Sequence, residues 1–144
     1  MVKHAEERRT AVLLDPHPLW LDVLEQILGK VGVETVGRLT SPSEALALVE
    51  SLRPTLLLVD PDARDAELDG LESLRQACAR FPSLVAIAFS GSDDPARIDA
   101  AFAAGALGYV VKTAAREDLV AAVRGGFQSL LPRSAHTVGA GPSA

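Results

Sequence analysis

The sequence predicts a doubly wound α/β fold, in which a five-stranded parallel sheet carries helices on both faces. Short apolar runs alternate with amphipathic stretches along almost the whole chain. Strands that alternate with helices form a parallel sheet joined by right-handed crossovers. Two of the apolar runs contain hardly any polar residue, as is typical of strands buried on both faces. The pattern therefore favours five β–α units in one domain.

The five short apolar runs are the predicted strands. They cover residues 11–14, 33–36, 55–59, 84–89 and 107–111. The third and fourth runs are the most apolar, and they are too short to be buried helices. We therefore expect these two strands near the centre of the sheet.

The amphipathic stretches between the runs are the predicted helices. They cover residues 19–31, 41–52, 71–81, 94–105 and 115–127. Ser41 and Glu44 have the spacing of a capping box, with Pro42 at the first helical position. Pro82 is expected to end the third helix and Gly105 to close the fourth.

The expected strand order is 2-1-3-4-5, the order of flavodoxin-like folds, which is borrowed from known folds of this class. The domain is predicted to span residues 10–128, after a flexible N-terminus at 1–9. Residues 129–144 are rich in Ser, Gly, Pro and Ala, which predicts a disordered tail or a truncated linker. The sequence leaves open whether the chain is complete or a fragment that lacks an output domain.

Composition excludes several classes of protein. The net charge is −5 and there is no lysine- or arginine-rich block, so direct nucleic-acid binding is not expected. The apolar run after the charged N-terminus is too short for a signal peptide or a membrane span, which predicts a cytoplasmic protein without membrane contact. Cys78 is the single cysteine, so no internal disulfide can form.

Four chemically complementary residues follow four of the predicted strands: Asp15, Asp60, Ser90 and Lys112. In an open parallel sheet, ligands bind beyond the carboxyl ends of the strands, so these side chains are expected to converge. A carboxylate can attack phosphorus and form an acyl phosphate, while a lysine and a bound cation balance the charge of the phosphoryl group. Asp60 is the best candidate for the nucleophile because it closes the most apolar strand.

Five motifs occur in a fixed order along the chain. They are L-L-D-P-H-P at 13–18, L-L-L-V-D at 56–60, D-G-L-E at 69–72, A-F-S at 88–90 and G-Y-V-V-K at 108–112. Together they resemble the receiver domain of two-component response regulators, in the branch that often carries a helix-turn-helix output domain. The resemblance covers about residues 10–127.

The resemblance implies a signalling switch rather than an enzyme. Asp60 would accept a phosphoryl group from a histidine kinase or a phosphotransfer protein, with Mg²⁺ held by Asp15 and Asp60. Ser90 would bond the phosphoryl oxygen and Lys112 would pair with it, while Tyr109 would turn inward and act as a switch together with Ser90. Output would pass through protein contacts, in a homodimer or a hetero-complex, on the face of the fourth helix, fifth strand and fifth helix.

The acidic pair of this family is degenerate here, because Pro16 stands where a second acidic metal ligand is usual. The loss of a carboxylate beside a divalent ion is expected to weaken Mg²⁺ binding by an order of magnitude or more. Asp62, in the acidic loop after Asp60, is a candidate replacement ligand; the alternative is that this loop is simply solvated. His17 is interpreted as a marker of the subfamily rather than as a metal ligand.

Two functional hypotheses therefore stay open. One is a receiver phosphorylated on Asp60; the other is a degenerate receiver that acts as a protein-interaction module without phosphate. A third, a small α/β enzyme or flavin carrier, is disfavoured because the two prolines after Asp15 remove donors that a phosphate cradle needs. The sequence does not identify the kinase, the signal or the output.

Overall fold

The computed structural model describes residues 8–129, which form five parallel strands and five helices. The strands are β1 (Arg9–Leu14), β2 (Val33–Leu39), β3 (Leu56–Val59), β4 (Val85–Ser90) and β5 (Gly108–Val111). The helices are α1 (Pro18–Lys30), α2 (Pro42–Leu52), α3 (Gly70–Arg80), α4 (Pro95–Ala104) and α5 (Arg116–Gln128). The strand order is β2-β1-β3-β4-β5, so the predicted fold class and strand order are confirmed.

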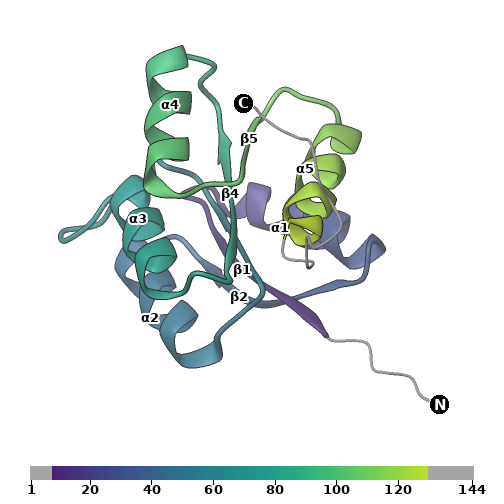
Figure 1. The fold of residues 1–144 in the computed structure, drawn as a ribbon, viewed down its shortest axis with the longest axis horizontal. Helices are drawn as coiled ribbons and strands as arrows, with labels where there is room; N and C mark the ends of the chain where they lie inside the picture. The colour runs from purple at the N-terminus through teal and green to yellow at the C-terminus, as the bar shows by residue number, and fades with distance from the viewer. Residues whose placement is uncertain (1–7, 130–144) are drawn as a thin grey trace.

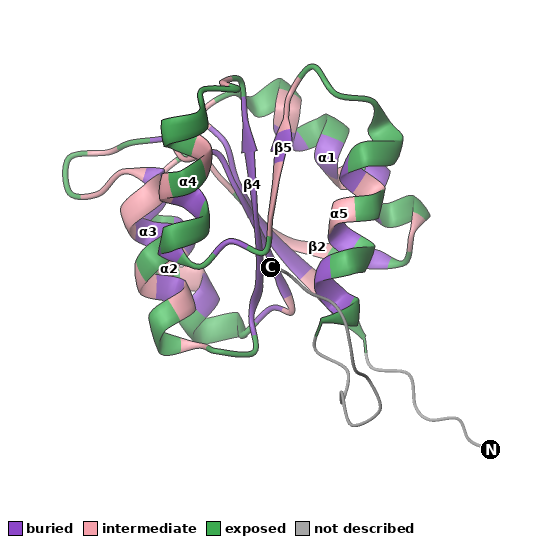
Figure 2. Cartoon of the chain, turned by 45° about the horizontal axis from the view of Figure 1, so that its top comes forward, coloured by how far each residue is buried: buried purple, intermediate pink, exposed green. Residues whose placement is uncertain are grey.

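The helices cover both faces of the sheet, with α1 and α5 on one side and α2, α3 and α4 on the other (Figure 1). The side chains of β1 show why, since Ala11 and Leu13 belong to the apolar cluster beneath α1 and α5. Val12 and Leu14 belong to the cluster beneath the other three helices. The central strands are buried along their length (Figure 2). Burial on both faces explains their continuous apolar sequence.

The helix ends follow the local signals in the sequence. Ser41 caps α2 by accepting a hydrogen bond from the Glu44 amide at 3.3 Å, as the capping pattern predicts. Asp69 caps α3 in the same way. Gly105 ends α4 in the left-handed conformation, with φ of 118°, which favours glycine.

β2 extends three residues beyond the end that the apolar run predicted. Gly37 and Arg38 interrupt the apolar run, but the backbone continues to pair with β1 through Leu39, after a shift in register. β2 is an edge strand, so a polar side chain can point to solvent while the ladder continues. Arg38 uses this position to pair with Asp22 and Glu25 of α1.

The first strand of the domain begins close to the predicted N-terminal boundary. β1 already includes Arg9, one residue before the predicted start of the domain. Residues 1–7 and 130–144, which include most of the predicted flexible terminus and tail, lie outside the described residues. Within residues 8–129, the helices are too short and too polar to cross a membrane.

Candidate functional site

Three of the four predicted residues meet beyond the carboxyl ends of the central strands. Asp15 follows β1, Asp60 follows β3, and Lys112 follows β5. The Lys112 Nζ atom lies 2.8 Å from Asp15 Oδ2 and 2.8 Å from Asp60 Oδ2. The two aspartates are 0% and 4% exposed, so their charges are removed from water. The parallel sheet therefore gathers two buried carboxylates around one ammonium group.

Backbone contacts fix the orientation of each carboxylate. The His17 amide donates to Asp15 Oδ1 at 2.9 Å, and the Asp62 amide donates to Asp60 Oδ1 at 2.8 Å. The Asp60 amide donates in turn to the Leu14 carbonyl at 2.9 Å, which continues the pairing of β3 with β1. Both side chains are thus positioned by the turn that follows their own strand.

The charges in this pocket do not balance, because two carboxylates face one ammonium group. Lys112 also lies beside two aromatic rings, 5.4 Å from the centroid of Trp20 and 5.6 Å from that of Phe89. These rings lower the local dielectric and strengthen the interactions between the charges. One negative charge is therefore left over, and a bound cation could neutralise it.

Ser90, the last residue of β4, and Tyr109 of β5 both form hydrogen bonds with Ser92 in the loop between β4 and α4. Ser90 is buried, and its hydroxyl accepts a hydrogen bond from the Ser92 amide at 3.1 Å. The Tyr109 hydroxyl donates to the Ser92 carbonyl at 2.7 Å. Both predicted switch residues therefore contact the same residue of the loop, although their coupling to a phosphoryl group stays a prediction.

The Asp62 carboxylate is directed toward α4, where it forms an ion pair with Arg97. The described residues that could hold a metal ion together are instead Asp15, His17 and Asp60, whose ligand atoms lie within 4.8 Å of one another. Sequence reasoning set His17 aside because it has no Cys or His partner. The spacing of Asp15 and His17 places both in one turn, where the His17 amide donates to Asp15. A metal role for Asp62 stays a prediction.

The long loop between β3 and α3 is attached to α2 by Asp65. Its carboxylate accepts hydrogen bonds from the Ser41 hydroxyl at 2.7 Å and the Ser43 amide at 2.8 Å. It also accepts from two amides of its own loop, those of Glu67 and Leu68. The Ser41 hydroxyl, followed by these amides, holds the pKa of Asp65 far below its ordinary range. This part of the acidic loop is therefore a structural connection.

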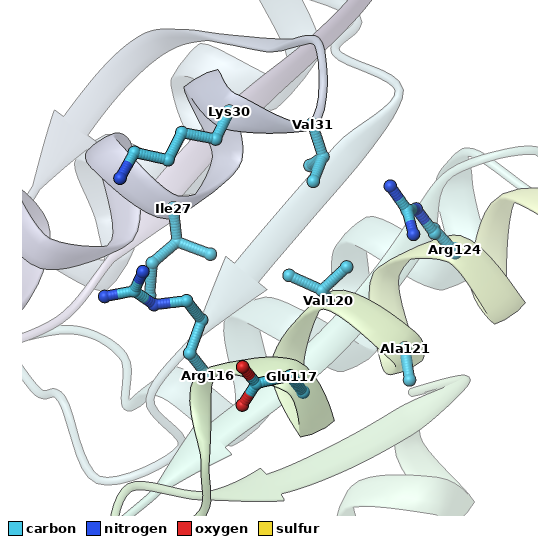
Figure 3. A pocket seen from close by; sticks show the side chains of 8 residues that line it. All are labelled: Ile27, Lys30, Val31, Arg116, Glu117, Val120, Ala121 and Arg124. Atoms are coloured by element: carbon cyan, nitrogen blue, oxygen red, sulfur yellow. The ribbon is translucent and has the colours of Figure 1, made fainter.

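A separate hollow of about 340 Å³ lies between α1 and α5. Figure 3 shows Ile27 and Val31 of the α1 side and Val120 of α5 among its lining side chains. The cationic residues Lys30 and Arg124 also line it. Arg116 and the anionic Glu117 complete the charged part of the lining, so the hollow combines apolar side chains with charges of both signs.

A family model described as the response regulator receiver domain matches residues 11–124. The transcriptional regulatory protein YhcZ of Bacillus subtilis, itself uncharacterized, is 32% identical over 88 residues, which cover 61% of this chain and 40% of that protein. The DNA-binding transcriptional activator EvgA of Escherichia coli is 28% identical over 113 residues, covering 78% of this chain and 54% of that protein. The chain thus spans about half the length of the curated relatives it matches.

The same similarity is seen among solved structures. A CheY-like response regulator receiver domain protein from Methanospirillum hungatei has a TM-score of 0.77 to this chain at 23% sequence identity. The match covers 86% of this chain and 97% of that one. At this identity the likeness shows the fold alone, and the fold agrees with the strand order described above.

Proposed function

This chain belongs to the response regulator receiver family, and on that premise we propose that Asp60 is its phosphoacceptor. The observation that carries the proposal is the pairing of a buried carboxylate with Lys112 at 2.8 Å, next to a second buried carboxylate, Asp15. Receiver domains partner histidine kinases, and the donor here would be the phosphohistidine of a kinase or of a phosphotransfer protein.

The proposed transfer is a displacement at phosphorus. An oxygen of the Asp60 carboxylate forms the new P–O bond while the P–N bond to the donor histidine breaks and its electron pair stays on the imidazole. Lys112, which is free to exchange its contact with the carboxylate for one with the phosphoryl oxygens, stabilises the transferred negative charge. Burial of Asp60 among apolar strands strengthens that interaction.

A divalent cation fits the pocket because two buried carboxylates share one ammonium group, which leaves one negative charge unbalanced. Asp15 and Asp60 would hold the ion, which, when bound, neutralises phosphoryl oxygens during transfer. Pro16 supplies no side-chain oxygen, so the proposed Mg²⁺ affinity is weaker than an acidic residue there would give.

The proposed output surface is formed by α4, β5 and α5. Phe102 of α4 and Leu107, which precedes β5, are both about half exposed. Apolar side chains that stay exposed are candidates for contact with a partner protein. A phosphoryl group that attracts Ser90 would move the Ser92 loop and thus the hydrogen bond of Tyr109, changing the population of the binding-competent state.

The proposed partner on this surface is a second copy of the chain or another regulator. DNA binding belongs to relatives such as EvgA, of which this chain covers only about half. The net charge of −5 and the lack of a lysine- or arginine-rich block in the sequence disfavour contacts with DNA phosphates, so we propose that this chain acts through protein contacts rather than by binding DNA itself. The competing proposal, a phosphorylation-independent interaction module, is favoured by Pro16 alone.

Intact-mass spectrometry after incubation with acetyl phosphate and Mg²⁺ separates these two functions. The chain should gain one phosphoryl group, and Asp60→Asn should remove the reaction because an amide is a poor nucleophile of similar shape. Asp22→Asn is the matched control, since it changes an exposed carboxylate of α1 that pairs with Arg38 and has no proposed role in the pocket, and it should still be modified. Pro16→Asp should raise the yield. Failure of both the natural chain and Pro16→Asp to react would leave the interaction module as the function.

A further inference from the structure

The acidic pocket has a nitrogen ligand at its edge. The Nδ1 atom of His17 lies 3.3 Å from Asp15 Oδ1. Asp15, His17 and Asp60 each offer one ligand atom, and these three atoms lie within 4.8 Å of one another. The His17 side chain is 66% exposed, so its imidazole is open to solvent on one side and borders a fully buried carboxylate on the other. An ion arriving from solvent would therefore meet the imidazole first.

The contacts of Asp15 divide the pocket into two sides. Lys112 lies on the Oδ2 side, in an ion pair without the alignment of a hydrogen bond, so the buried Oδ2 atom lacks a hydrogen-bond donor among the described residues. His17 lies on the Oδ1 side. Lys112 neutralises one of the two carboxylates, which leaves one negative charge unbalanced. The side next to His17 thus offers both charge and ligand atoms to a cation.

We propose that Asp15, His17 and Asp60 form a mixed imidazole–carboxylate site that binds a divalent first-row transition ion in preference to Mg²⁺. Imidazole nitrogen suits ions such as Co²⁺, Ni²⁺ and Zn²⁺, whereas Mg²⁺ requires oxygen ligands in near-octahedral geometry. Pro16 reinforces the preference, because it removes an oxygen ligand from the turn and leaves His17 as the next side chain.

The proposed ion would take part in phosphoryl transfer only if the proposed function is correct, so to this extent the inference rests on that function. Binding of the ion itself requires no phosphodonor. The two proposals can therefore fail separately: a chain that selects a transition ion but is never phosphorylated would keep the site and lose the switch.

The test uses Co²⁺ as the probe. Calorimetric titration of the whole chain with Co²⁺ and, separately, with Mg²⁺ gives the two affinities, and the visible absorption of bound Co²⁺ reports on its ligands. The chain should bind Co²⁺ more tightly than Mg²⁺. His17→Gln should weaken Co²⁺ binding by about tenfold or more, as expected when a ligand is lost, and leave Mg²⁺ binding almost unchanged.

Two variants make the result specific. His4→Gln combined with His136→Gln removes the other histidines of the sequence, which lie outside the described residues, and should leave Co²⁺ binding as it is. Asp15→Asn should weaken binding of both ions, since it removes the shared carboxylate. The proposal is overturned if His17→Gln leaves the affinity for Co²⁺ and the absorption of bound Co²⁺ unchanged. It is also overturned if the double variant at His4 and His136 no longer binds Co²⁺, or if the natural chain binds Mg²⁺ more tightly than Co²⁺.

Discussion

Asp60 and Asp65 lie at opposite ends of one short stretch of loop, and their carboxylates are stabilised in different ways. Asp60 is buried beside Asp15, and the two share Lys112 as their cation. Asp65 accepts four hydrogen bonds, two of them from the start of α2. The first arrangement leaves negative charge for a ligand to neutralise, whereas the second satisfies the carboxylate within the protein. Acidic residues close in sequence can thus serve binding in one case and architecture in the other.

The largest effect should come from removing the cation of the pocket. Lys112→Met leaves two buried carboxylates without a counter-charge, and breaking a buried pair in this way is expected to lower the free energy of unfolding by about 3 kcal/mol. Urea unfolding monitored by circular dichroism measures it. The double variant Lys112→Met, Asp15→Asn should recover part of the loss because it removes the repulsion. A double variant less stable than Lys112→Met alone would contradict this account of the pocket.

A smaller effect is expected at Gly70, where the loop enters α3. A Cβ atom there would lie 2.1 Å from the Asp60 carbonyl oxygen, so Gly70→Ala must displace the backbone of the acceptor turn. We expect a loss of about 2 kcal/mol in the free energy of unfolding, together with slower phosphorylation of Asp60. Gly29→Ala, also in a helix but with open space around it, is the control and should not destabilise the protein. Equal stability of the two variants would show that the turn adapts freely.

The smallest effect should come from Asp65, and it should depend on pH. Because its pKa is lowered in the folded protein, its contribution to stability is present above the ordinary carboxyl range and is lost as the pH falls toward the folded pKa. Asp65→Asn should therefore destabilise the protein slightly at neutral pH and flatten the loss of stability below about pH 4. Urea unfolding across this range measures both. Identical pH profiles for the variant and the natural chain would refute the assignment.

The sequence was sufficient to predict the features that depend on neighbouring residues, such as the strands and the residues that directly follow them. Asp15, Asp60 and Lys112 could be placed together because each directly follows a strand, and the strand order of a doubly wound sheet brings those strands side by side. The contact of Asp65 with Ser41 could not be predicted, since it joins a loop to a helix far away in sequence. The pairing of Asp62 with Arg97 is of the same kind.

Trp20 gives the pocket an optical property. It is the single tryptophan of the sequence, it packs edge-on against Phe89, and its ring lies next to the Lys112 ammonium group. Indole emission responds to nearby charge, so the intrinsic fluorescence of the chain arises beside the groups that a metal ion or a phosphoryl group would rearrange. The natural chain therefore carries its own reporter, and ion binding can be followed in real time without attaching a dye.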